Sequence, residues 1–133
     1  MIRLFLSFLL CLSTLSADYF RDALLAYKQG NFTVAKELFE LSIKKQNSFQ
    51  GYFFLGKMYL HGEGVDANST LAIPYLEQAV MKGNIKAKCY LAEAYLKNDV
   101  KQAEAILLLS QGAKETPICR EIATTYNLYI NGQ

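Results

Sequence analysis

Apolar side chains recur along residues 18–130 every three or four positions, and short polar or glycine-containing segments interrupt the pattern. This spacing places apolar residues on one face of an α-helix, whereas a strand would show alternation. The pattern predicts an all-α chain with helices at about 18–29, 32–46, 49–60, 69–82, 85–97, 100–112 and 117–130.

Polar residues at the predicted starts of three helices support these boundaries. Asn68 is placed to cap the fourth helix, and Thr116 precedes Pro117 at the first position of the last helix. Asp99, followed three residues later by Gln102, is typical of a capping box at the start of the sixth helix.

Glycine and proline give further boundary signals. Gly30 and Gly83, each followed by asparagine, predict the ends of two helices, because glycine is favoured just beyond a helix C-terminus. Pro74 lies inside the fourth helix, where it removes a backbone hydrogen bond. We therefore expect a kink or a late start of that helix.

The helices form a repeat. Tyrosine ends an apolar pentad in each first helix, at intervals of 32, 36 and 31 residues: Tyr27, Tyr59, Tyr95 and Tyr126. Such helix pairs bury one stripe within the pair and another against the next pair, so they stack. We expect an α-solenoid of about three helix–turn–helix units and a terminal capping helix, with boundaries at 18–47, 51–84, 85–114 and a half-unit 115–133.

The length and the charge of the chain exclude some classes of function. The chain of 133 residues has room for one domain, and its 14 basic residues balance 12 acidic ones without a run of one sign. A surface without a basic stripe is not expected to bind nucleic acid.

Residues 1–17 have the pattern of a signal peptide. Arg3 precedes the apolar stretch 4–12, and Ala17 is the small residue expected before a cleavage site. The stretch is shorter than the about 20 residues that span a bilayer, so no integral membrane segment is expected after cleavage. Leu10 before Cys11 argues against lipidation. We therefore expect an exported protein, periplasmic or secreted.

Residues 51–87 resemble a Sel-like repeat, a subgroup of the tetratricopeptide-type helical repeats. The resemblance rests on LGKMYLHGEGV, Asn68, Ala72, Tyr75-Leu76, Ala79 and Gly83-Asn84. Residues 20–47 look more like a plain tetratricopeptide unit, and 88–114 lack the glycine loop. The resemblance implies an α-solenoid that acts as an adaptor in exported or envelope-associated bacterial proteins.

The cysteines depart from the family's secreted, cysteine-rich branch. Cys89 and Cys119 match the later members of that branch's cysteine pairs, but Met81 and Gln111 occupy the earlier positions. Two interpretations stay open: a bridge between Cys89 and Cys119, whose helices should be adjacent in stacked units, or two separately buried thiols.

No catalytic, metal or cofactor site is expected. Ser42 and Lys45 fit the S-x-x-K pattern of β-lactamases, but its companion elements are absent, so we interpret them as the solvated end of a helix. His61 is the one histidine, too few for a histidine-based metal cluster or catalytic triad, and is interpreted as a loop residue.

One modification motif is present. Residues 66–70, Asp-Ala-Asn-Ser-Thr, satisfy the acidic-extended acceptor sequence of bacterial N-glycosylation, with Asn68 as the acceptor. Asn31 fits only the short form of the acceptor sequence. The alternative is that Asn68 serves only as a helix cap.

Binding is expected on the concave surface formed by the first helices. Side chains opposite the packing tyrosines are the candidates: Lys28, Tyr52, Lys57, Glu93 and Lys97. We expect a non-catalytic adaptor that binds a protein partner. The alternatives are a β-lactamase-like or penicillin-binding enzyme and a structural envelope subunit. The oligomeric state is left open, since exposed repeat faces at both ends would permit self-association.

Overall fold

A computed structural model describes residues 18–130, so the predicted signal peptide with Arg3, Cys11 and Ala17 lies outside the described residues, as do residues 131–133. Within 18–130 the chain contains seven α-helices and no strand. The helices are α2 (Tyr19–Lys28), α3 (Phe32–Gln46), α4 (Phe49–His61), α5 (Ser69–Met81), α6 (Ile85–Lys97), α7 (Gln102–Gly112) and α8 (Pro117–Thr125). The predicted all-α class is confirmed.

Several predicted boundaries are confirmed by the backbone. The Asn68 side chain accepts a hydrogen bond from the Leu71 amide at 2.9 Å and caps α5. Gly30 and Gly83 follow α2 and α5 with φ angles of 77° and 86°. A residue with a Cβ is disfavoured in this left-handed conformation, so glycine ends both helices at low cost.

The start of α7 differs from the prediction. Its N-cap is Lys101 rather than Asp99, and both residues have positive φ angles, 47° and 53°. The Gln102 side chain donates to the Asp99 carboxylate. The two predicted side chains therefore meet, but they hold a turn before the helix instead of capping its first amides.

The predicted end of α8 is corrected, and one of the two distortions expected at Pro74, the late start of the helix, is absent. Helix α8 ends at Thr125, not near 130, because Asn127 takes a left-handed conformation and the Leu128 amide bonds back to Ala123. The following segment returns Ile130 to the core. Helix α5 contains Pro74 without the late start expected there.

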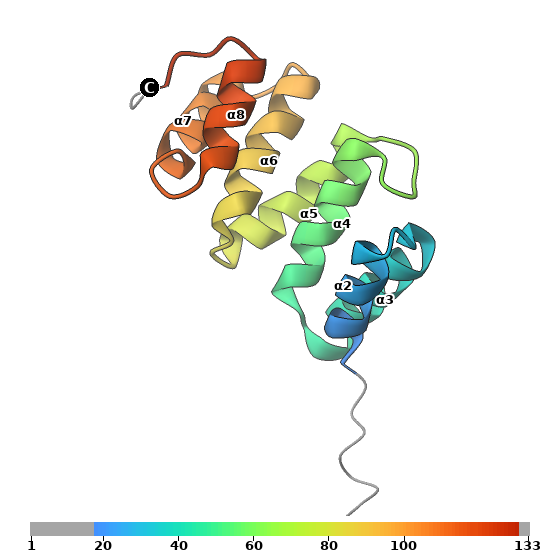
Figure 1. The fold of residues 1–133 in the computed structure, drawn as a ribbon. Helices are drawn as coiled ribbons and strands as arrows, with labels where there is room; N and C mark the ends of the chain where they lie inside the picture. The colour runs from blue at the N-terminus through green and yellow to red at the C-terminus, as the bar shows by residue number, and fades with distance from the viewer. Residues whose placement is uncertain (1–17, 131–133) are drawn as a thin grey trace, which may run out of the picture.

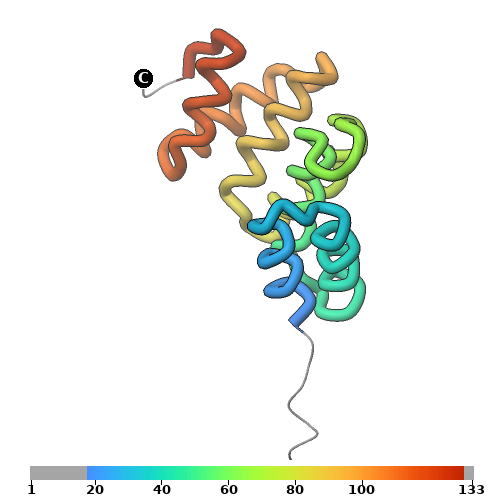
Figure 2. Tube along the Cα trace, turned by 45° about the vertical axis from the view of Figure 1, so that its right-hand side comes forward, coloured from blue at the N-terminus to red at the C-terminus, as the bar shows by residue number. Residues whose placement is uncertain are grey.

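The helices pack in chain order. Each first helix lies against its second helix in the pairs α2–α3, α4–α5 and α6–α7, and α8 packs against both α6 and α7. Figure 1 shows α2 and α3 at one end of the array and α7 and α8 at the other, and Figure 2 shows the same order from a turned view. The arrangement is that of a short helix–turn–helix solenoid.

Helix α4 joins two apolar clusters. Leu55 and Met58 pack in the cluster of the first pair, and Phe53 and Leu60 pack in the cluster of the later helices. Within α4, Gly56 lets Leu76 approach so closely that a Cβ at position 56 would lie 2.6 Å from its Cγ. A helix that is buried on two sides holds neighbouring units together. None of the helices within 18–130 is long and apolar enough to cross a bilayer.

Candidate functional site

The first arm of the site joins three side chains across the first two helix pairs. Lys57 Nζ, on α4, donates to Tyr27 Oη at 2.6 Å and to Glu63 Oε1 at 3.3 Å. Tyr27 Oη, on α2, donates in turn to Glu63 Oε2 at 2.6 Å. Burial raises the pKa of Tyr27 above its ordinary value, and the hydrogen bond and charge of the Glu63 carboxylate raise it further. The phenol therefore remains a proton donor at neutral pH.

The second arm joins His61, the last residue of α4, to α6. His61 Nε2 lies 3.2 Å from Glu93 Oε2, and Lys97 Nζ lies 3.2 Å from Glu93 Oε1. Burial alone would raise the pKa of Glu93, but the hydrogen bonds and charges of His61 and Lys97 outweigh it and lower that pKa. The carboxylate is therefore ionised at neutral pH although its side chain is only 13% exposed.

Tyr90 on α6 lies against the second arm and in the electrostatic field of the first. Its ring meets the His61 ring edge to face, with centroids 5.4 Å apart. Burial raises the pKa of its phenol, which also lies in the fields of Lys57 and Glu93. We call this set the central polar network: Tyr27, Lys57, His61, Glu63, Tyr90, Glu93 and Lys97.

Three of the five predicted binding residues belong to this network: Lys57, Glu93 and Lys97. Lys28 is exposed in the last turn of α2. Tyr52 lies instead beside Tyr75 of the second helix α5, with ring centroids 6.5 Å apart. The structure therefore brings together the charged candidates of α4 and α6 but not Tyr52.

Four members of the network are not among the predicted binding residues: Tyr27, His61, Glu63 and Tyr90. Tyr27 was expected to pack between helices, and His61 was expected in a loop, whereas the structure places His61 as the last residue of α4. A usable signal was present: Lys57 and Glu93 occupy the same repeat position with opposite charge. The contacts of Glu63, however, depend on where the loop between α4 and α5 lies, and the repeat pattern does not specify that position.

The loop between α4 and α5 is held against the first unit. Gly64 has a φ angle of 73°, and a Cβ there would overlap the Cβ of Phe32. At the end of the loop the backbone N–H of Asn68 donates to the Tyr59 carbonyl at 2.6 Å. Because the backbone is fixed at both places, His61 and Glu63 keep their positions between α2 and α6.

Ser42 is not at a solvated helix end, which corrects the interpretation made from the sequence. It is fully buried, and its Oγ donates to the Phe39 carbonyl at 2.7 Å. Gly51 of α4 packs so closely that a Cβ there would lie 2.7 Å from that Oγ. Lys45 is exposed. An acyl donor cannot reach the Ser42 hydroxyl in this fold, so this serine is not placed to act as a nucleophile.

Cys89 and Cys119 form a disulfide, which decides between the two interpretations left open above. The bond joins α6 to α8, and both residues are fully buried. Gly112 at the end of α7 lies against it, where a Cβ would overlap the Cys119 sulfur. The absence of a side chain at Gly112 therefore makes room for the disulfide.

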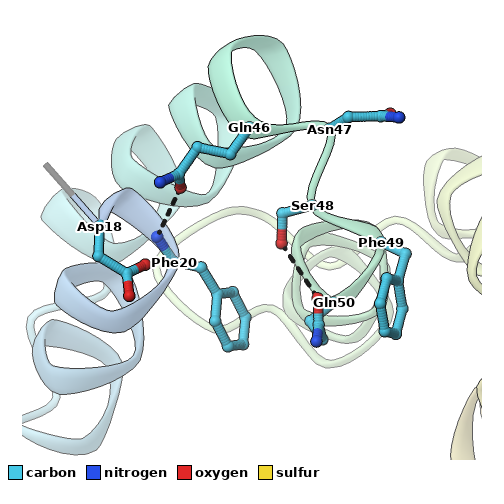
Figure 3. A pocket seen from close by; sticks show the side chains of 7 residues that line it. All are labelled: Asp18, Phe20, Gln46, Asn47, Ser48, Phe49 and Gln50. Carbon is cyan, nitrogen blue, oxygen red and sulfur yellow. Dashed lines mark hydrogen bonds between the residues drawn. The ribbon is translucent and has the colours of Figure 1, made fainter. Parts of the chain in front are cut away.

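Two surface recesses lie away from the central polar network. A recess of about 300 Å³ between α5, α6 and α7 contains Tyr95, whose Oη bonds to Glu77 at 2.8 Å and to Lys101 at 3.1 Å. A second, of about 410 Å³, lies where the first pair meets α4. Figure 3 shows its lining residues, with the Phe20 amide bonded to Gln46 and Ser48 bonded to Gln50. In the part of the chain that the structure describes, no group of acidic, histidine and cysteine residues could hold a metal ion.

No protein-family model matches this chain, and neither a curated protein nor a solved structure is significantly similar to it. The resemblance to Sel-like repeats therefore rests on the sequence motif alone, and the sequential packing of the helices is consistent with a small helical repeat.

Proposed function

We propose that this chain is an exported, Sel-like helical-repeat adaptor that binds a protein partner along the face of the central polar network. The observation that carries the proposal is the convergence of opposite charges from α4, α6 and the loop between α4 and α5: Lys57, Glu63, Glu93 and Lys97. A short solenoid with a polar face of this kind suits the recognition of a polar or charged peptide segment.

The geometry supports binding more than chemistry. Lys57 and Glu93 are partly buried and held by fixed partners, so their positions cost little conformational entropy when a ligand arrives. Lys28 and Lys97 are exposed at the ends of first helices, where long side chains can reach a bound segment.

Export to the periplasm or the extracellular space is part of the proposal. The disulfide between Cys89 and Cys119 supports it, because structural disulfides persist in oxidising compartments. The leader-like residues 1–17 support it independently.

The alternatives have less support. The β-lactamase-like function has no observation in its favour, since Ser42, its sequence candidate, is buried. A structural envelope subunit would need association through exposed repeat faces. Sedimentation of the purified mature chain tests this alternative, and a concentration-dependent oligomer would favour it over the adaptor.

The experiment compares matched lysines. Lys28, Lys97 and Lys44 all lie in the last turn of their helices and are exposed, but only Lys44 belongs to a second helix. Mature protein carrying each lysine-to-glutamate change is used to capture partners from the envelope fraction. We expect a stoichiometric partner that is lost with Lys28→Glu or Lys97→Glu and kept with Lys44→Glu.

Equal capture by all three variants would contradict the assigned face. Circular dichroism of each variant checks that the fold is intact, which separates a lost contact from a lost structure.

A further inference from the structure

We propose that Asn68 is N-glycosylated in the folded, exported protein. The inference rests on the proposed export but not on the identity of the partner. It concerns the acceptor segment 66–70, which lies at the junction of the loop and α5. In Figure 1 the loop between α4 and α5 extends beyond the ends of these helices at the edge of the molecule.

The acceptor segment is accessible. Asp66, Ala67 and Asn68 are exposed and have no regular secondary structure. The backbone of Asn68 is extended, with φ −148° and ψ 93°. An extended and exposed backbone is what a transferase needs in order to seat an asparagine in its active site.

The two ends of the Asn68 amide have separate roles. Its Oδ1 accepts the Leu71 amide at 2.9 Å and caps α5. Its Nδ2 has no hydrogen-bond partner within residues 18–130. A sugar on Nδ2 leaves Oδ1 free to keep the cap, so capping and glycosylation are compatible at this residue.

The hydroxyl residue of the motif is also exposed. Thr70 lies in the first turn of α5, and its Oγ1 donates to Asn98 Oδ1 at 2.9 Å. A hydrogen bond at an exposed site exchanges readily with water, because its net contribution to stability is only about 1 kcal/mol. Thr70 can therefore leave Asn98 and present its hydroxyl to a transferase.

The reaction requires a donor of defined class, a polyprenyl-pyrophosphate-linked oligosaccharide. Nδ2 attacks the anomeric carbon and forms an N-glycosidic bond. The bond between that carbon and the pyrophosphate oxygen breaks, and its electron pair leaves with the lipid pyrophosphate. One amide proton passes to a base of the transferase. No oxidant or reductant is needed.

The chain contains a natural comparison site. Asn31 is an exposed N-cap with Thr33 two residues later, so it also satisfies the short acceptor pattern. The residue two positions before Asn31 is Gln29, whereas Asp66 precedes Asn68. A transferase that requires the acidic residue would modify Asn68 and leave Asn31 unmodified.

The test is intact-mass measurement and peptide mapping of the full chain purified from the extracytoplasmic fraction of its native cells. We expect an oligosaccharide increment on the peptide that contains Asn68 and none on the peptide that contains Asn31. Asn68→Asp should remove the increment while its carboxylate oxygen keeps the helix cap, so thermal stability should stay unchanged. Asp66→Asn should reduce occupancy at least tenfold.

A wild-type chain at the unmodified mass would overturn the proposal, as would an increment that persists in Asn68→Asp. Separate measurements test export and partner binding. The mass of the amino-terminal peptide shows whether the chain is cleaved after Ala17, and partner capture by the Lys97→Glu variant tests the binding face. Failure of glycosylation is thereby distinguishable from failure of the proposed function.

Discussion

Cys89 on α6 and Cys119 on α8 form a buried disulfide across the end of α7, with Cα atoms 4.8 Å apart. Within residues 18–130, no second helix follows α8 to cover it. A covalent link to α6 therefore holds the terminal helix where a complete unit would use packing alone. In a solenoid, such an end is where unfolding would otherwise begin.

Removing the disulfide is expected to destabilise the C-terminal end first. The loop-entropy argument for a separation of 30 residues gives a contribution of roughly 3 to 4 kcal/mol. Denaturation in urea, with the wild type compared with the double variant Cys89→Ala and Cys119→Ala, measures this difference. Amide exchange should rise first in α8 and least in α4, and a uniform rise would contradict a local role.

Gly112→Ala is expected to destabilise the oxidised protein and to be tolerated without the sulfurs. The added methyl group would overlap the Cys119 sulfur and lie 3.3 Å from that of Cys89. Overpacking of this kind costs about 1 to 3 kcal/mol, whereas alanine is better than glycine inside a helix by up to about 1 kcal/mol.

A double-mutant cycle in urea, combining Gly112→Ala with the two cysteine-to-alanine changes, tests this. The sign of the effect should reverse between the two backgrounds. An equal loss in both would show that the strain lies elsewhere.

Gly64→Ala is expected to cost more than Gly30→Ala. Both glycines have positive φ angles, 73° and 77°, so both variants lose roughly 1 to 2 kcal/mol from the backbone. At Gly30 nothing lies within 4 Å of an added Cβ, whereas at Gly64 the Cβ of Phe32 is in the way. The extra cost at Gly64, about 1 to 3 kcal/mol, measures how tightly the loop is held on the first unit.

Chemical denaturation of both variants provides the comparison. Equal losses would mean that the loop moves away from Phe32 without penalty, and would weaken the argument that the loop fixes His61 and Glu63.

Glu93→Gln is expected to lower stability by about 1 kcal/mol at pH 7, because a charged hydrogen-bond acceptor is replaced by a neutral one. The pKa of Glu93 in the folded state is below its ordinary value of 4.5. Between the folded and unfolded pKa values the unfolded chain binds more protons, so acidification disfavours the folded state. The difference in unfolding free energy between wild type and variant should therefore have its full value above about pH 5.5. It should shrink as the pH falls through 4.5 and below.

Urea denaturation of both proteins from pH 7 down to pH 3 measures this dependence. Glu104→Gln is the matched control, since Glu104 is half exposed and lies 3.8 Å from the exposed Lys101, where solvent screens the ion pair and little loss of stability is expected. A constant difference for Glu93→Gln across the range would contradict the assigned ion pairs.

Most of the fold was predictable because its determinants are local. The spacing of apolar residues placed all seven helices of the described region, and Asn68, Gly30 and Gly83 marked boundaries that the backbone confirms. The errors lie where a turn decides the boundary. Left-handed residues at Asp99 and Asn127 set the start of α7 and the end of α8, and neither is glycine.

The candidate site was predictable only in part. The charges of Lys57 and Glu93 follow from their repeat positions, but the roles of Tyr27, His61 and Glu63 depend on a loop that reaches over neighbouring units. Burial of Ser42 was missed for the same reason, because the residue that covers it, Gly51, belongs to another helix pair.

The sequence by itself determined the helical class, the order of the helix pairs and the Asn68 cap of α5, since these depend on contacts within a few residues. The tertiary structure alone decided the pairing of Cys89 with Cys119, the burial of Ser42 and the contacts that Glu63 and His61 make with α2 and α6. The disulfide and the contacts of Tyr27 and His61 require side chains about 30 residues apart to meet, and Ser42 is covered by a residue of the next unit. All of these contacts depend on how each unit is rotated against the next.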